Sequence, residues 1–150
     1  MLRIKVFAWL TFSDRLNTRD MLRRRNWNVT NVYTCALCPC NVTEDWMHLF
    51  FQCNFSLRIW NYLQIEWQQA DSMEQVFFLT KRSFNKPFFT EVVILASWHI
   101  WKHRNDVVFS RIQPSFRAWR RAFLHEASLH VHRMKSKHAD QWSRWIDSLL

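Results

Sequence analysis

Three cysteines and one histidine in a short stretch of this chain have the spacing of a zinc site. Two residues separate Cys35 from Cys38, nine separate Cys38 from His48, and four separate His48 from Cys53. Zinc prefers four tetrahedral nitrogen and sulfur ligands, and a Cys-x2-Cys turn supplies two thiolates from one tight loop. The sequence therefore predicts one structural Zn²⁺ site, with the ligands Cys35, Cys38, His48 and Cys53.

The spacing of the last two ligands constrains the backbone between them. Five residues turn an α-helix through about 500°, so His48 and Cys53 would not share a face of an unbroken helix. We therefore expect a short helix that ends near Phe51 and Gln52, with Cys53 returning from the loop after it. Buried free cysteines or a redox Cys-x2-Cys pair are the alternatives, and no βαβ pattern accompanies the pair.

Cys40 leaves the choice of ligand open, because it lies two residues past Cys38 and is able to replace either Cys38 or His48. Since Cys35-x2-Cys38 makes the standard turn and Pro39 stiffens the chain after it, we assign Cys40 as a spare thiol.

The sequence shows no membrane-spanning run and no signal-peptide pattern, and this predicts the cellular compartment. No apolar run is long enough to span a membrane, and the charged start before Val6–Leu10 has no small-residue cleavage site after it. We expect an intracellular protein, in the nucleus rather than the cytoplasm and not secreted. In a reducing compartment, metal binding by the cysteines is favoured over disulfides.

Composition and charge narrow the class of function. The chain has no glycine, which excludes glycine-rich phosphate loops, and its net charge is +9. Residues 35–71 carry one Lys or Arg against four acids, whereas residues 1–34 carry seven against two. A basic balance of this size suits a polyanion such as RNA or DNA. Solvated helix faces are the alternative explanation.

Helical patterns fill most of the remaining chain. We expect helices over residues 4–12, 19–26, 43–51, 56–67, 72–79 and 88–108 and one long final helix from 114, with an extended lead-in over 29–34 and a basic loop over 81–86. The expected N-caps are Thr18, Thr43, Ser56 and Ser72. The predicted fold is mostly α: a small zinc-stabilised helical domain, residues 1–67, and a basic helical C-terminal region, residues 68–150.

The combined motifs resemble the plant reverse transcriptase zinc-binding domain of LINE-type non-LTR retrotransposons. The resemblance rests on the runs at 5–10 and 14–25, on Cys35-Ala-Leu-Cys38, on Glu44-x3-His48-Leu-Phe-Phe-x-Cys53 and on Trp60, and extends more weakly to residues 98–105. It implies the same four zinc ligands. It also implies an accessory role beside a polymerase. The sequence departs from the family at Pro39, where glycine is usual.

Catalysis is not expected. A polymerase or ribonuclease H needs clustered metal-binding carboxylates, and the chain has only 12 acids and no Tyr-x-Asp-Asp. His99 and His103 are four residues apart on one helix, but the run lacks the glutamate of a His-Glu-x-x-His site. We take both as residues of an amphipathic helix.

The predicted partner is RNA or DNA, contacted through Arg23, Arg24, Arg25 and Trp27. Mobile cations suit phosphates and an aromatic ring beside them suits bases. The alternative is a structural or protein-interaction module, docking on a reverse transcriptase domain or another protein through exposed aromatics, with zinc needed only for the fold.

Overall fold

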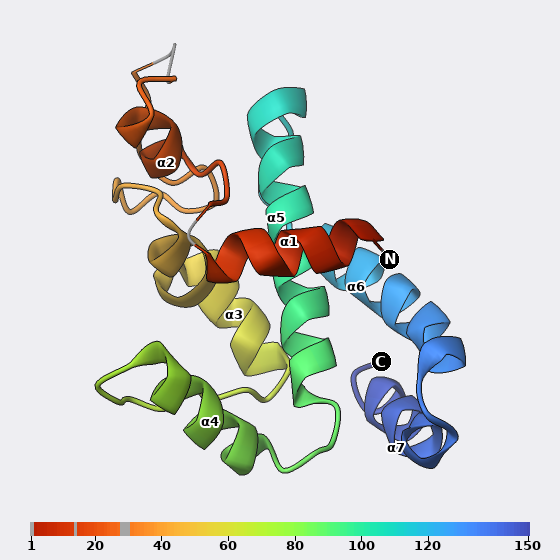
Figure 1. Cartoon of the computed structure of the whole chain (residues 1–150). Coiled ribbons are helices and arrows are strands. Elements are labelled where there is room, and N and C mark those ends of the chain that lie inside the picture. Colours follow the sequence, from red (N-terminus) through yellow and green to blue (C-terminus); the bar gives the residue numbers. More distant parts are fainter. Residues whose placement is uncertain (1, 14, 28–30) are drawn as a thin grey trace.

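The computed structural model describes residues 2–13, 15–27 and 31–150, and within these ranges the chain is mostly helical and has no β-strand (Figure 1). The elements are α1 (Leu2–Phe12), α2 (Arg19–Arg24), η1 (His48–Gln52), α3 (Asn54–Tyr62), α4 (Met73–Phe84), α5 (Phe89–Ser110), α6 (Phe116–His130), η2 (Val131–Arg133) and α7 (Ser136–Asp147). The predicted mostly α fold is confirmed. Among the described residues, no helix combines the length and apolar character needed to cross a membrane.

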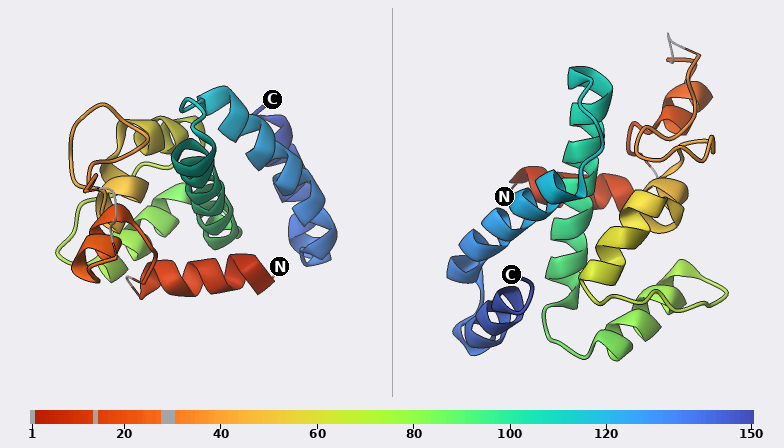
Figure 2. Two further views of the ribbon diagram at one scale, coloured as in Figure 1. Left: turned by 90° about the horizontal axis from the view of Figure 1, so that it is seen from above. Right: turned by 180° about the vertical axis from the view of Figure 1, so that it is seen from behind.

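Helix α5 is the central element of the fold. Its sequence is apolar around most of its circumference, as expected of a helix that is covered on several sides. Helix α1 crosses it and α6 packs along it, while α4 lies near its N-terminal end (Figures 1 and 2). The ring centroids of Phe7 in α1 and Trp98 in α5 are 5.3 Å apart.

The C-terminal part corrects the prediction of one long final helix. Helix α6 ends at His130, and η2 turns the chain into a separate α7. Trp142 and Trp145 of α7 are buried, and the ring of Trp142 lies 5.2 Å from that of Phe88. This C-terminal helix therefore packs on the core and does not fray, because burying two tryptophan side chains removes a large apolar area from water.

Two predicted N-caps are confirmed. The side chain of Thr18 accepts a hydrogen bond from the Met21 amide at the start of α2, and that of Ser72 accepts one from the Gln75 amide at the start of α4. Each satisfies an amide that the first turn of a helix leaves without an intrahelical partner.

The two other predicted N-caps are wrong. Thr43 forms an isolated antiparallel bridge with Thr34, and the carboxylate that accepts from the first amide of η1, that of His48, belongs to Asp45, at 2.7 Å. Ser56 lies inside α3, where it is buried. Residues 29 and 30 of the predicted extended lead-in lie outside the described residues.

The basic loop predicted over residues 81–86 is also wrong in part. Helix α4 continues to Phe84, so Lys81 and Arg82 stand in its last turn. Cations are favourable there because they face the negative end of the helix dipole.

The two predicted domains share one hydrophobic core in the described chain. Residues of α1, η1 and α3 belong to the same buried cluster as residues of α5, α6 and α7. The Tyr62 hydroxyl also donates to the Leu149 carbonyl at 2.7 Å. The division after residue 67 stays a prediction, and the packing joins both sides of it.

Candidate metal centre

The four predicted ligands lie together in space. The ligand atoms of Cys35, Cys38, His48 and Cys53 are all within 4.8 Å of one another. The Cys35 and Cys53 sulfurs are 3.8 Å apart, and the Cys38 sulfur is 3.3 Å from His48 Nε2. Two thiolates at about 2.3 Å from one tetrahedral zinc ion would be about 3.8 Å apart. The cluster therefore has the donor set and the spacing for a single ion.

The first two ligands come from a tight turn between short extended segments. The bridge of Thr34 with Thr43 closes it, and the Cys35 amide donates to the Val42 carbonyl at 2.8 Å. Inside the turn, the Leu37 amide donates to the Cys35 sulfur at 3.4 Å. A backbone amide aimed at a sulfur stabilises negative charge on it, which suits a thiolate ligand.

A π turn solves the spacing problem of the other two ligands. Element η1 is a π-helix, and the Cys53 amide donates to the His48 carbonyl at 2.7 Å. An i→i+5 hydrogen bond is wider than the α-helical bond, so it stacks two residues five positions apart. The helix ends at Gln52, near the predicted place, and Cys53 is the extended residue that follows it, joined to His48 by this wide turn.

The metal-free thiols favour their protonated form. The hydrogen bond to Cys53 is the largest cause that raises the pKa of Cys35 far above its usual range, and burial adds to it. Burial is the main cause that raises the pKa of Cys38, to about 11. A bound cation reverses this preference, because it stabilises the thiolate that it coordinates.

The fourth cysteine is a neighbour of Cys38, with which it hydrogen-bonds, but it is not one of the converging ligands. Cys40 is exposed, and its sulfur accepts a hydrogen bond from Asn54 Nδ2 at 3.4 Å. It is not among the four side chains whose ligand atoms converge.

The predicted nucleic-acid residues lie on and just after α2. Arg23 and Arg24 each form an ion pair with Asp20, at 2.8 and 3.0 Å. The Arg25 guanidinium lies over the Trp27 ring, 5.5 Å from its centroid. All three arginines and Trp27 are exposed to solvent.

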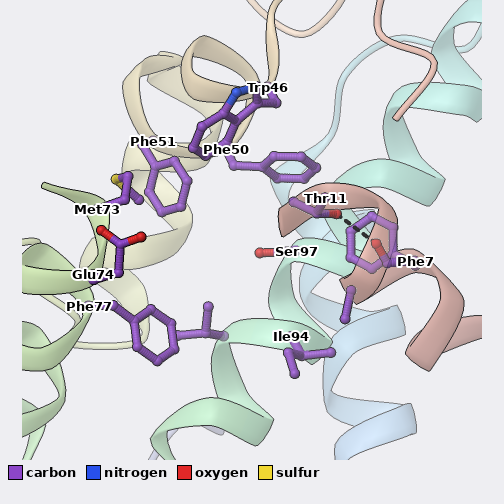
Figure 3. A pocket seen from close by; sticks show the side chains of 12 residues that line it. Phe7, Thr11, Trp46, Phe50, Phe51, Met73, Glu74, Phe77, Ile94 and Ser97 are labelled. Atoms are coloured by element: carbon purple, nitrogen blue, oxygen red, sulfur yellow. Dashed lines mark hydrogen bonds between the residues drawn. The ribbon is translucent and has the colours of Figure 1, made fainter. Parts of the chain in front are cut away.

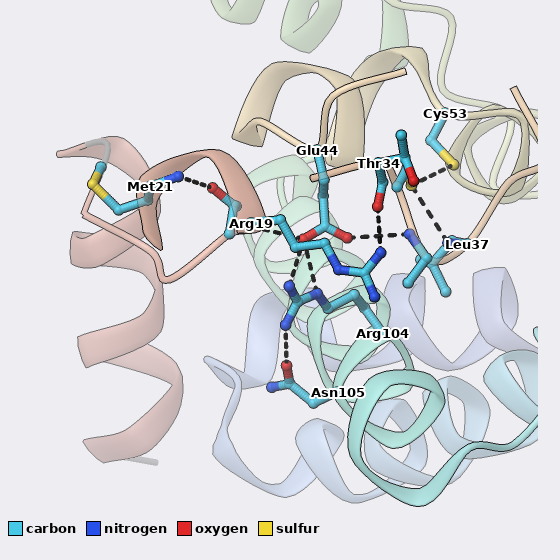
Figure 4. Close-up of polar contacts among 11 residues, drawn as sticks. Arg19, Met21, Thr34, Leu37, Glu44, Cys53, Arg104 and Asn105 are labelled. Atoms are coloured by element: carbon cyan, nitrogen blue, oxygen red, sulfur yellow. Dashed lines mark hydrogen bonds and ion pairs between the residues drawn. The ribbon is translucent and has the colours of Figure 1, made fainter. Parts of the chain in front are cut away.

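The sequence interpretation missed the side chain that links this centre to the rest of the fold. It took Glu44 as a first-turn residue of a helix, but Glu44 is fully buried and ion-paired with Arg104 of α5 (Figure 4). These two residues are 60 positions apart, so no local pattern joins them. Both residues stand in motifs that carry the family resemblance, Glu44 before His48 and Arg104 within residues 98–105, but neither motif indicates that the two side chains meet.

The comparison with protein families bears on this segment of the chain. Residues 1–60 match the family model for zinc-binding in reverse transcriptase. The match spans all four converging side chains and the arginines of α2. Among curated proteins and among solved structures, nothing matches the chain at a significant level. The first 60 residues are thus similar to a zinc-binding domain of reverse transcriptases, and the Cys₃His cluster within them fits a metal ion.

Proposed function

We propose that this chain is a non-catalytic zinc module, derived from a retrotransposon reverse transcriptase, that binds RNA or DNA beside a polymerase. The observation that carries the proposal is the convergence of three thiols and one imidazole within the segment that matches the family model. Zinc suits this donor set better than magnesium or calcium, which prefer oxygen ligands. The protein would act inside the cell, in the nucleus.

The surface around α2 supports nucleic acid as the partner. Three exposed arginines gather there: Arg23 and Arg24 pair with the Asp20 carboxylate, and Arg25 lies over the Trp27 ring. The Arg25 side chain donates to the Asn17 side chain at 3.2 Å and covers the exposed ring of Trp27. A ring that already stacks with a guanidinium offers the surface on which bases of a single strand stack.

A second pair of the same kind extends this surface toward α1. The Arg15 guanidinium lies 5.3 Å from the centroid of the Trp9 ring, and Trp9 is 56% exposed. Arg15 and Asn17 both line a groove of about 400 Å³ between α1 and α5. Asn17 therefore contacts Arg25 and shares the groove lining with Arg15. The groove is also lined by the rings of Trp98 and Trp101, on which bases of a single strand could stack.

The test replaces Arg23, Arg24 and Arg25 with Ala and measures binding to single-stranded RNA and DNA at several salt concentrations. Each lost phosphate contact on a single strand lowers the slope of log affinity against log salt by about 0.7. We expect weaker binding for all base sequences, a smaller salt slope and unchanged zinc content.

A matched control removes three exposed cations from α6 and α7, which lie on the other side of α5 (Figure 2). In this control Arg117, Arg121 and Lys137 become Ala, so the loss of net charge is the same. If the control and the α2 variant lose equal affinity, binding depends on net charge alone. If the α2 variant binds like the parent, its arginines are a solvated helix end.

One feature favours the alternative, a protein-interaction module in which zinc serves only the fold. An apolar cavity of about 500 Å³ lies between α1, η1, α4 and α5 (Figure 3). Its walls include the aromatic rings of Phe7, Trp46, Phe50, Phe51 and Phe77. A complex formed by filling this cavity would depend little on salt, whereas a nucleic-acid complex would weaken steeply as salt rises. The salt series above therefore separates the two functions.

A further inference from the structure

A buried carboxylate lies beside the metal centre without being one of its ligands. The side chain of Glu44 is fully buried, and Arg104, which faces it, is 2% exposed. A buried charge is costly unless a partner and hydrogen bonds compensate it. The fold keeps this pair directly behind the Cys35–Cys38 turn, so its contacts are informative.

The two carboxylate oxygens of Glu44 have different partners (Figure 4). Oε1 accepts from Arg104 Nε at 3.0 Å and from Arg104 Nη2, and also from the Arg19 amide at 3.1 Å. Oε2 accepts from the amide of Ala36 at 3.3 Å. Ala36 lies between the two cysteines of the metal-binding turn. One carboxylate thus ties that turn to the start of α2 and to α5.

The backbone of Glu44 reinforces the same connection. Its amide donates to the Tyr33 carbonyl at 2.8 Å, and its carbonyl accepts from the Asp20 amide at 3.0 Å. The Arg19 guanidinium also donates to the Thr34 carbonyl, next to Cys35. These bonds leave the turn little freedom to move relative to α2.

Arg104 is itself fixed by its own helix. Its Nη1 donates to the Asn105 side chain at 3.0 Å, and its guanidinium lies 5.0 Å from the centroid of the Trp101 ring. It lies well outside residues 1–60, the part of the chain that matches the family model. A rigid helix therefore presents the cation to the carboxylate behind the metal centre.

We propose that Glu44 is a positioning residue of the metal centre, and that Arg104 of α5 holds it in place, so that residues beyond the family match complete the site. Glu44 fixes the Ala36 amide and with it the conformation in which the Cys35 and Cys38 sulfurs converge. Arg104 balances the charge of Glu44, which otherwise would lie uncompensated beside three thiolates. Partners of this kind, which hold the ligands of a metal, typically affect metal affinity by 10- to 100-fold.

The experiment measures Zn²⁺ affinity of the full chain by competition with a chromophoric chelator, and records the absorption spectrum with Co²⁺ in place of zinc. Glu44→Gln and Arg104→Met are each expected to weaken zinc binding by about 10- to 100-fold. Both should also shift the Co²⁺ ligand-field bands, because the geometry of the sulfurs changes. Arg104→Lys keeps the charge but not the two N–H groups that reach Oε1, so it should recover only part of the affinity.

Arg120→Met is the matched control. Arg120 is a part-buried arginine that donates to the Tyr62 hydroxyl and to the Leu149 and Leu150 carbonyls, away from the cysteines. Its loss should lower the melting temperature yet leave zinc affinity and the Co²⁺ spectrum unchanged.

The proposal is overturned if folded Arg104→Lys and Glu44→Gln proteins bind zinc as tightly as the parent with the same Co²⁺ spectrum. It is equally overturned if Arg120→Met weakens zinc binding as much as Arg104→Met does. A parent chain that binds no metal would refute the metal centre itself. A chain that binds zinc but no nucleic acid would contradict the proposed function and leave the role of Glu44 and Arg104 unaffected.

Discussion

Zinc binding should release protons from the cysteines. The raised pKa values of the thiols set the minimum number of protons released per zinc ion. At pH 7.5 the metal-free protein keeps both Cys35 and Cys38 protonated, because the pKa of Cys38 is about 11 and that of Cys35 is raised further. Zinc coordinates thiolates, so at least two protons must leave for each ion that binds. The logarithm of the zinc affinity should then rise by about two for each unit of pH. One proton contributes about 1.36 kcal/mol per pH unit, so the binding free energy of zinc should become more favourable by about 2.7 kcal/mol for each unit of pH.

The metal-free protein should respond to pH in the opposite sense. A thiol whose pKa is higher in the folded state contributes stability that is present below its unfolded value and is lost as the pH rises. For Cys38 this loss runs from the ordinary value of 9.0 to about 11. The melting temperature of the metal-free protein should therefore fall above pH 9, whereas the stabilisation by zinc should grow between pH 6 and 8.

Calorimetric titration of zinc in two buffers with different heats of protonation counts the released protons directly. Cys40→Ser is the control, and it should leave the count unchanged because Cys40 stands outside the cluster. Release of clearly fewer than two protons per ion, or an affinity that is independent of pH, would refute the reasoning.

Three further outcomes are expected. By metal analysis, Cys38→Ser should lose zinc and Cys40→Ser should keep it. Equal loss in both variants would show that the wrong thiol was assigned as a ligand. A chelator should first increase hydrogen exchange in residues 31–53, since the metal holds this segment, and uniform exchange across the chain would speak against that. Trp142→Ala should cost about 3–5 kcal/mol in denaturant unfolding, because its ring is buried against Phe88. The exposed control Leu129→Ala should change stability by less than about 0.5 kcal/mol.

The ligand spacing was readable from the sequence because it is a local property. Cys35, Cys38, His48 and Cys53 lie within 19 residues, and zinc chemistry restricts how such donors are arranged. The caps at Thr18 and Ser72 were readable for the same reason, since each bonds to an amide three residues on. The π turn of η1 was not, because the sequence shows only that an α-helix cannot satisfy the spacing.

Long-range packing explains the features that were missed. The partner of Glu44 is Arg104, and tertiary contact alone decides that this carboxylate is buried instead of standing at a helix start. Ser56 has the side chain of an N-cap, but its hydroxyl donates to the Leu49 carbonyl inside the core. The break between α6 and α7 follows from the burial of Trp142, which a reading by helical period alone does not reveal.

The central claim is that Cys35, Cys38, His48 and Cys53 hold one zinc ion. Mass spectrometry under native conditions, on the full chain purified with zinc and without a chelator, tests it most directly. The account predicts the mass of the chain plus one zinc ion, with the loss of protons that thiolate coordination requires. A chain that carries no ion, or one that carries two, would contradict it.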